Sequence, residues 1–290
     1  MKPLKITDIR EKQGDAAFLI DDGKTAIMYD SGFAFTGETV AKKIKSSLGD
    51  RELDYIFLTH SHYDHALGAV YAKKMFPRAK IVAFEYAAKI FEKSSARAVM
   101  RELDRKHASS CGVFEYEDLI DELSVDISVR DGDVIAAGDM SFEVLSLPGH
   151  TKCSVGYYCR EKKLLLGCET LGVFDGVSDI VPSYLVGYAM TMDSIQRVRS
   201  LEIDGIVVPH YGLIEGDTAR LYLEKAYSTT KSMTEDFVGL LREGASNEDI
   251  LEEFKKRFYR GFVTEAYPID AMTLNVGIMT DLLRCEFNIE

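Results

Sequence analysis

The chain has 290 residues, enough for one large domain or slightly more. Its 47 acidic and 35 basic residues give a net charge of −12. This balance disfavours a nucleic-acid partner, because nucleic-acid-binding proteins usually present a basic groove. The apolar runs in the sequence fall far short of the about 20 residues that a membrane-spanning helix needs, so no membrane segment is expected.

The cysteines and the amino-terminal residues indicate in which cellular compartment the protein is expected. The five cysteines are scattered and include no C-x-x-C pair, which favours reduced thiols over a disulfide framework. Residues 1–5 are not followed by an apolar core or a small-residue cleavage site, so no signal peptide is expected. These features predict a cytoplasmic protein.

Apolar runs and turn residues predict strands through the first part of the chain and again after a helical segment. Residues 17–20 and 25–29 are joined by Asp21-Asp22-Gly23-Lys24, a turn with glycine at a site suited to positive φ. Further strands are predicted at residues 53–58, 80–84, 125–129, 133–135, 142–147, 154–159, 163–166 and 205–208. Helical spacing is found at residues 40–48, 66–75, 85–109, 192–201, 218–241, 247–258 and 270–284. Residues 173–188 are interpreted as a long loop, and Ser246 or Asn247 is expected to cap the helix that follows.

The stretch from residue 56 to residue 65 carries the strongest chemical signal. An apolar strand leads directly into a loop that holds His60, His62, Asp64 and His65, which include half of the six histidines in the chain. Imidazole and carboxylate groups are ligands for divalent metals. Four such groups in one tight turn would repel or stay half-satisfied without a cation. The loop therefore predicts a metal site.

Three later strands also end on a polar loop. His150 follows residues 142–147, Glu169 follows residues 163–166, and His210 follows residues 205–208. Ligands at the ends of separate strands can assemble one metal site at an edge of the sheets. His107, the one histidine outside these motifs, lies in the helical segment and is interpreted as a surface residue.

The sequence His60-Ser61-His62-Tyr63-Asp64-His65, followed by the three later loops, resembles the metallo-β-lactamase superfamily over residues 15–215. The resemblance implies an α+β fold, an αββα sandwich of two mixed β-sheets flanked by helices, with a two-metal site at one edge. It divides the chain into a metallo-β-lactamase-like domain, residues 1–215, and a C-terminal helical cap packed on the same body, residues 216–290. The ligands that it implies are His60, His62 and His150 for the first metal, and Asp64, His65 and His210 for the second.

The bridging position departs from the family pattern. The family places an aspartate there, whereas this chain has Glu169 in Gly167-Cys168-Glu169-Thr170. Because glutamate is one methylene longer, it must fold back or bind one metal more closely than the other. Asp175 is a second candidate for this position. Asp30, in the family's early strand-end turn, is expected to accept a hydrogen bond near the histidine loop and fix its geometry.

The resemblance implies a hydrolase with two divalent metal ions, zinc first and iron or manganese as alternatives. A metal lowers the pKa of bound water to about 7 and so provides a nucleophile at neutral pH, which Asp64 would orient and deprotonate. The expected substrate is a small ester, thioester, lactone or amide. The helices after residue 212 are similar to those of glyoxalase II-like hydrolases and related thioesterases, where they help to select the substrate.

Other functions on the same fold stay open. A non-haem iron oxidoreductase or dioxygenase ranks below hydrolysis, because the diiron oxidoreductases place glutamate where this chain has His62 and carry a flavin domain. A phosphodiesterase is a further alternative, and charge disfavours a nuclease. The complete ligand set argues against a non-catalytic sensor. The oligomeric state is open, and specificity is expected to depend on loop and cap aromatics such as Phe33, Phe35, Phe174, Tyr184 and Tyr188.

Overall fold

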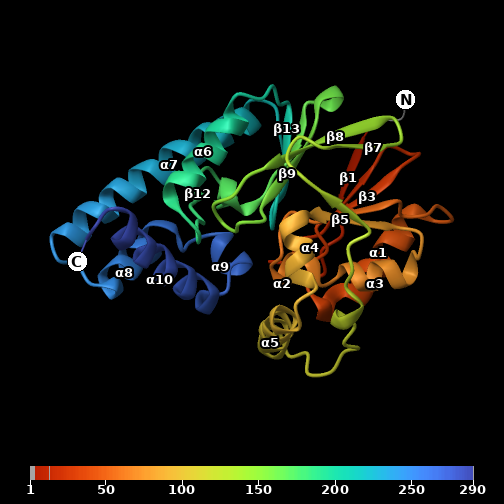
Figure 1. Ribbon diagram of the computed structural model, residues 1–290, viewed down its shortest axis with the longest axis horizontal. Coiled ribbons are helices and arrows are strands. Elements are labelled where there is room, and N and C mark those ends of the chain that lie inside the picture. The colour runs from red at the N-terminus through yellow and green to blue at the C-terminus, as the bar shows by residue number, and fades with distance from the viewer. Residues whose placement is uncertain (1–3, 13, 290) are drawn as a thin grey trace. The chain divides into compact units, whose positions relative to one another are not determined.

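The computed structural model describes residues 4–12 and 14–289. The chain forms two compact units (Figure 1). Unit 1 comprises Met1–Leu145 and Val155–Glu161, and unit 2 comprises Ser146–Ser154 and Lys162–Glu290. The protein has two mixed β-sheets flanked by helices, which confirms the predicted α+β class. The domain boundary at residue 215 stays a prediction.

The first sheet lies wholly in unit 1. Its strands, in spatial order, are β1 (Lys5–Asp8), β2 (Phe18–Asp21), β3 (Ala26–Tyr29), β4 (Tyr55–Phe57), β5 (Lys80–Phe84) and β6 (Ile127–Val129). The β1–β2 and β2–β3 pairs are antiparallel, and the remaining pairs are parallel. Because parallel strands end at the same edge, the loops after β3 and β4 are neighbours. These loops hold Asp30 and the histidine stretch.

The helices of unit 1 are α1 (Ala34–Leu48), α2 (Tyr63–Ala66), α3 (Ala69–Met75), α4 (Glu85–Phe91) and α5 (Ser94–Ser110), with a 3-10 turn, η1 (Ile120–Glu122). Helices α1, α3 and α4 lie along one side of the first sheet in Figure 1. Helix α1 buries Val40, Ile44 and Leu48 at intervals of four residues, as an amphipathic helix does. It approaches α3 closely, since a Cβ on Gly37 would lie 2.4 Å from the Tyr71 ring.

Three more strands of unit 1 pack on the inner face of the first sheet. They are β7 (Val134–Ala137), β8 (Met140–Ser146) and β9 (Val155–Cys159). The ring of Phe57 in β4 stacks on Tyr157, with centroids 4.7 Å apart, and meets Phe142 edge-on at 5.4 Å. The Tyr157 hydroxyl donates to the Leu58 carbonyl at 2.8 Å. These contacts fix the end of β4, from which the histidine loop begins.

Unit 2 holds strands β10 (Leu164–Leu166), β11 (Val173–Phe174), β12 (Ile180–Val181), β13 (Gly205–Val208) and β14 (Gly212–Glu215). β10 and β13 are parallel, β13 and β14 are antiparallel, and β11 and β12 form a separate pair. The parallel pairing brings the ends of β10 and β13 to one edge. The loops that follow these ends carry Glu169 and His210.

The helices of unit 2 are α6 (Tyr188–Arg199), α7 (Asp217–Arg242), α8 (Asn247–Phe258), α9 (Val263–Ala266) and α10 (Ile269–Glu286), with the 3-10 turns η2 (Arg160–Lys162), at the boundary of the units, and η3 (Glu169–Leu171). Helix α7 packs against α6, β12 and β14, and α8 packs against α10 (Figure 1). Their shared core includes Phe237, Phe254 and Met279. Ser246 and Asp249 form a capping box at the start of α8, which confirms the predicted cap.

Several element boundaries differ from those predicted. Helix α1 begins at Ala34 and not at Val40, because Asp104 of α5 accepts a 2.9 Å hydrogen bond from the Ala34 N–H. Residues 85–109 form two helices rather than one continuous segment, and the predicted loop at residues 173–188 contains β11, β12 and the start of α6. Within residues 4–12 and 14–289, the five cysteines form no disulfide bond.

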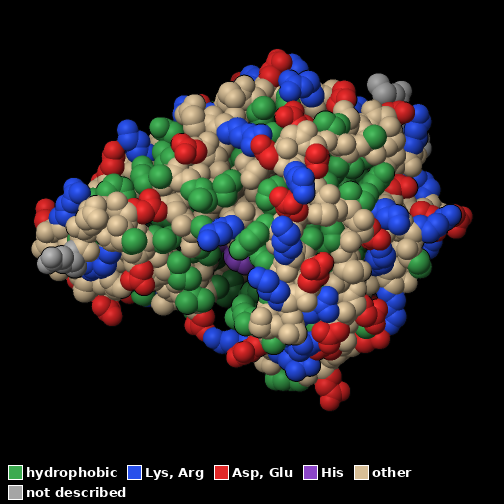
Figure 2. Space-filling model, viewed as in Figure 1, with side chains coloured by type: hydrophobic (Ala, Val, Ile, Leu, Met, Phe, Trp, Pro, Cys, Tyr) green, Lys and Arg blue, Asp and Glu red, His purple; other side chains and the backbone are tan. Residues whose placement is uncertain are grey.

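The surface carries both signs of charge. On the face shown in Figure 2, Lys and Arg side chains are interspersed with Asp and Glu. Within residues 4–12 and 14–289, no helix combines the length and the apolar character needed to cross a bilayer.

Candidate metal centre

Unit 1 gathers the four polar side chains of the histidine loop. The ring of His60 lies 4.6 Å from that of His62 and 4.1 Å from that of His65, between centroids. Oδ2 of Asp64 lies 3.5 Å from Nε2 of His65. His60 and His65 are fully buried, whereas His62 and Asp64 are partly exposed. The four ligands predicted from this stretch therefore lie together, two inside and two at the surface.

A buried carboxylate orients two of these histidines. Asp30, at the end of β3, accepts hydrogen bonds from Nδ1 of His65 at 2.8 Å and from the Thr59 N–H at 2.8 Å. The Thr59 hydroxyl donates to Asp30 at 2.9 Å and lies 2.9 Å from Nδ1 of His60. Since that hydroxyl proton goes to the carboxylate, its oxygen accepts from His60. Both rings thus carry their proton on Nδ1 and direct Nε2 towards a ligand position.

The backbone at Asp30 is held in an unusual conformation. Its φ of 49° lies in the left-handed region, which aspartate and asparagine enter more readily than most residues. Such strain is often found at functional sites.

Unit 2 brings together the other three predicted ligands. Oε2 of Glu169 lies 2.9 Å from Nε2 of His150, and Oε1 lies 3.4 Å from Nε2 of His210. All three side chains are buried. Each carboxylate oxygen therefore faces a different imidazole. The bridging role of Glu169, with its extra methylene, stays a prediction.

Neutral groups hold His150 in unit 2. Its Nδ1 lies 2.9 Å from the Ser183 carbonyl oxygen, which can only accept, so the proton is on Nδ1 and Nε2 faces Glu169. The His150 N–H donates to the Thr170 hydroxyl at 3.1 Å, and that hydroxyl donates to the Leu147 carbonyl at 2.7 Å. Gly149 permits this loop, because its φ is +152° and a Cβ there would lie 2.2 Å from Oγ1 of Thr191.

Asp175, the second candidate for the bridging position, has another role. Its Oδ1 accepts hydrogen bonds of 2.8–2.9 Å from three consecutive N–H groups, those of residues 177–179, in the turn between β11 and β12. Asp175 therefore stabilises that turn, and Glu169 is the carboxylate beside the histidines of unit 2.

The structure adds one histidine that the sequence interpretation placed at the surface. His107 of α5 is half-buried, with its ring centroid 4.7 Å from Phe33 and 5.7 Å from Phe35. Burial lowers the pKa of His107, and the nearby Asp64 carboxylate acts in the opposite direction. It lies there because α5 packs against α1 and α2, a tertiary contact that no motif in the sequence announces.

The donor set fits a divalent metal of borderline hardness. Each unit offers imidazole nitrogens and carboxylate oxygens among the residues suited to hold an ion, the combination that zinc and iron accept in proteins. His60, His65 and His150 use Nδ1 for hydrogen bonds, an arrangement typical of metal-binding histidines. Local contacts in both units therefore suit metal binding.

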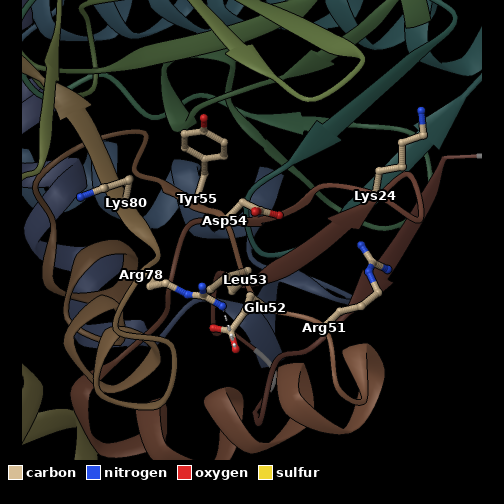
Figure 3. Close-up of a pocket in the computed structure, with 8 residues that line it drawn as sticks. All are labelled: Lys24, Arg51, Glu52, Leu53, Asp54, Tyr55, Arg78 and Lys80. Atoms are coloured by element: carbon tan, nitrogen blue, oxygen red, sulfur yellow. Dashed lines mark ion pairs between the residues drawn. The ribbon is translucent and has the colours of Figure 1, made fainter.

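A cavity of about 530 Å³ lies elsewhere in unit 1, at the amino ends of β4 and β5 (Figure 3). The histidine loop follows the opposite end of β4. Arg51 makes two 2.8 Å hydrogen bonds to Asp21, and Arg78 lies 3.7 Å from Glu52. The lysines that line the cavity are paired in the same way, Lys24 with Asp139 and Lys80 with Asp126. This balance of charge favours a structural role over anion binding.

A family model described as the metallo-β-lactamase superfamily matches residues 14–210. A hydroxyacylglutathione hydrolase of Nitrobacter winogradskyi is 34% identical over 107 residues, which cover 34% of this chain and 37% of that protein. The hydroxyacylglutathione hydrolase GloC of Haemophilus influenzae is 24% identical over 168 residues, 58% of this chain and 71% of that one. In the first three curated relatives the match spans 37%, 44% and 53% of their length.

Solved structures resemble the whole chain more evenly. An archaeal metallo-β-lactamase superfamily protein from Sulfolobus tokodaii has a TM-score of 0.63 at 20% identity and covers 98% of this chain and 99% of its own. A metallo-β-lactamase family protein from Thermus thermophilus has a TM-score of 0.60 at 20% identity, with coverage of 93% and 88%. At this identity the likeness establishes the fold.

Proposed function

Because the chain belongs to the metallo-β-lactamase superfamily, we propose that it is a metal-dependent hydrolase that cleaves a thioester of a small substrate. Esters, lactones and amides form the wider substrate class, and the thioester is preferred because several relatives are named hydroxyacylglutathione hydrolase. The proposed ligands are His60, His62 and His150 for one ion and Asp64, His65 and His210 for a second, with Glu169 shared between them.

One observation carries the proposal. Glu169 presents one carboxylate oxygen to His150 and the other to His210, so it would be able to help hold an ion beside each of these histidines. The histidine loop supplies the remaining four donors from a single turn. Two divalent ions, zinc first and iron or manganese next, account for the whole set without leaving a ligand residue unused.

The ions would lower the pKa of water towards 7 and polarise the substrate's carbonyl group. The chain's own residues perform the remaining tasks. Asp64, partly exposed and 3.5 Å from His65, orients the attacking water and accepts its proton. Asp30 and Thr59 fix the rings of His65 and His60, and Ser183 fixes the ring of His150. This fixed geometry reduces the reorganisation needed during the reaction.

Elemental analysis of the purified protein, followed by assays with a thioester, an ester, a lactone and a phosphodiester, tests the proposal. We expect bound metal and turnover of the thioester, and loss of both in His62→Ala and Asp64→Ala. Asp50→Ala, which changes an exposed aspartate, serves as the control. Wild-type turnover in Asp64→Ala, or the absence of metal from active protein, would contradict the proposal.

Iron-dependent redox chemistry on the same fold is separated by a second assay. Iron as the bound metal together with substrate-dependent oxygen uptake would replace hydrolysis with an oxidoreductase or dioxygenase function. Turnover of the phosphodiester alone would indicate a phosphodiesterase. A cytoplasmic location and the absence of a nucleic-acid partner stay predictions.

A further inference from the structure

Aromatic and cationic side chains gather beside the histidine loop of unit 1. We call this group, Lys12, Phe33, Phe35, Tyr63 and His107, the aromatic face. The Phe33 ring lies at its centre, with ring centroids 5.0 Å from Phe35, 5.7 Å from Tyr63 and 4.7 Å from His107. Tyr63 stands between His62 and Asp64 in the sequence. The aromatic face is therefore continuous with two of the proposed metal ligands.

The face rests on a fixed base. Phe33 is buried, with 3% of its surface exposed, whereas Phe35, Tyr63 and His107 are partly exposed. Asp104, one helical turn before His107, accepts the Ala34 N–H at 2.9 Å and so ties α5 to the start of α1. This hydrogen bond joins the helices that carry Phe35 and His107. A preformed surface of this kind binds a ligand with little ordering cost.

Lys12 gives the face a positive charge. Its Nζ lies 5.9 Å from the Phe35 ring centroid and donates to the Cys111 carbonyl at 3.3 Å. Within residues 4–12 and 14–289, no carboxylate forms an ion pair with it. The cavity in Figure 3 differs, because each of its lysines and arginines has an acidic partner. The charge of Lys12 is thus available to a ligand.

His107 adds a polar group among the rings. Its imidazole lies 4.7 Å from the Phe33 ring and 5.7 Å from the Phe35 ring, between centroids, and brings two ring nitrogens to this surface. Nε2 faces the Cys111 thiol at 3.8 Å, a weak partner. The face therefore combines flat π-surfaces, one cation and one hydrogen-bonding ring.

We propose that the aromatic face binds an aromatic or flat unsaturated ring that carries an anionic substituent, as the recognition part of the substrate. The ring stacks on Phe35 and Tyr63, the anionic group pairs with Lys12, and His107 forms a hydrogen bond to the same ligand. This names the substrate class for the proposed hydrolase and rests on that function. Ring binding itself requires neither metal nor turnover.

The chain contains no tryptophan, which allows a direct binding test. Phe35→Trp places a single indole on the aromatic face, and Phe114→Trp places one on a side chain that is 79% exposed in the same unit. Terephthalate is the probe, and trans-1,4-cyclohexanedicarboxylate, which has the same charges without a π-surface, is its comparison. We expect saturable quenching by terephthalate in Phe35→Trp, binding of the cyclohexane compound weaker by about 5-fold or more, and no saturable signal in Phe114→Trp.

The contribution of Lys12 is measured in the Phe35→Trp protein. Lys12→Met should weaken terephthalate binding by about 3- to 10-fold, and Lys42→Met, at an exposed lysine of α1, should not change it. If the indole disturbs folding, saturation-transfer NMR measures terephthalate binding without it. Binding to the wild-type protein is then compared with binding to Phe35→Leu. Equal binding of both dicarboxylates, or no difference on Phe35→Leu, would overturn the inference.

Kinetics separates this inference from the proposed function. His107→Gln and Phe35→Leu should raise KM for a thioester with a 4-carboxybenzoyl group about 5-fold more than they raise KM for acetyl thioester, because they remove binding to the ring. Lys42→Met, at an exposed lysine of α1, should leave both KM values at wild type. Turnover with no selective change in KM refutes the aromatic face alone. Absence of any turnover refutes the hydrolase, and the binding experiment then still decides whether the face takes the ring.

Discussion

The two units orient their histidines by different chemical means. In unit 1 the buried carboxylate of Asp30 accepts a hydrogen bond from Nδ1 of His65. It also accepts one from the Thr59 hydroxyl, whose oxygen accepts from Nδ1 of His60. In unit 2 a backbone carbonyl, that of Ser183, accepts Nδ1 of His150. Both arrangements fix the same tautomer. They differ in charge.

This difference has consequences for strength and for pH. Hydrogen bonds to an ionised group are roughly twice as strong as neutral ones. A buried carboxylate that loses its hydrogen-bond donors, however, destabilises the folded protein. Unit 1 uses a buried carboxylate again where Asp104 caps α1. Unit 2 places its buried carboxylate, Glu169, on the Nε2 side of the histidines. We therefore expect substitutions of the orienting groups to be severe in unit 1 and mild in unit 2.

The largest effect is expected from Asp30→Ala. It removes the acceptor of His65 and of Thr59 in a site with 0% exposure, so the free energy of unfolding should fall by about 3–5 kcal/mol. Metal affinity, measured by chelator competition, should fall by about 10- to 100-fold. Asp30→Asn keeps the shape and tolerates the φ of 49°, and should lie between wild type and Asp30→Ala. Wild-type metal affinity in both variants would show that Asp30 does not orient the ligands.

Asp104→Asn should change how stability depends on pH. Burial raises the pKa of Asp104 to about 6, although the Tyr116 hydroxyl and the N–H groups of Ala34 and Phe35 act in the opposite direction. Because the folded pKa lies above the ordinary value of 3.8, the stabilising contribution is complete below pH 3.8 and is lost as pH rises through about 6. The wild-type free energy of unfolding should thus fall by about 3 kcal/mol over this interval relative to the variant.

Urea unfolding of both proteins between pH 4 and pH 7.5, in the presence of chelator, provides the measurement. Groups other than Asp104 titrate in both proteins, so their effects cancel in the difference. If the free energy of unfolding depends on pH in the same way in wild type and Asp104→Asn, the pKa of Asp104 is not raised in the folded protein.

The positions of the proposed ligand residues could be predicted because their signals are local. His60, His62, Asp64 and His65 follow one apolar strand, and a strand determines where its terminal loop lies. Glu169, like His150 and His210, follows a strand end in the same way. For Asp30, which was expected to fix the histidine loop, the structure shows the hydrogen bond to His65. That the two ligand sets serve one metal centre stays a prediction.

The orienting groups of unit 2 and the surroundings of His107 could not be predicted in this way. Ser183 approaches Nδ1 of His150 with its carbonyl oxygen at 2.9 Å and its hydroxyl oxygen at 3.0 Å. Every residue possesses a carbonyl, and no motif in the sequence sets this serine apart from others. Asp104 and His107 reach α1 and α2 only through the packing of α5. The early start of α1 has the same origin, because its cap comes from a residue 70 positions away.

Thr59→Val tests the hydrogen bonds that link Asp30 to His60 through the Thr59 hydroxyl in unit 1. The substitution removes the hydroxyl that donates to Asp30 and accepts from His60, and should lower the free energy of unfolding by about 2 kcal/mol. Thr59→Ser keeps both bonds and should restore all but about 0.5 kcal/mol. Chemical denaturation with chelator measures the two variants. If Ser and Val lose the same stability, the hydroxyl is not the relevant group.

Thr170→Val is the neutral counterpart in unit 2 and should have the smallest effect. It removes a hydroxyl that accepts the His150 N–H at 3.1 Å and donates to the Leu147 carbonyl at 2.7 Å. Because neither partner is charged, we expect a loss of about 1 kcal/mol in the free energy of unfolding, roughly half the loss in Thr59→Val, with recovery in Thr170→Ser. Metal affinity should change little, since Nδ1 of His150 keeps its bond to Ser183. A loss equal to that of Thr59→Val would mean that charge does not distinguish the two networks.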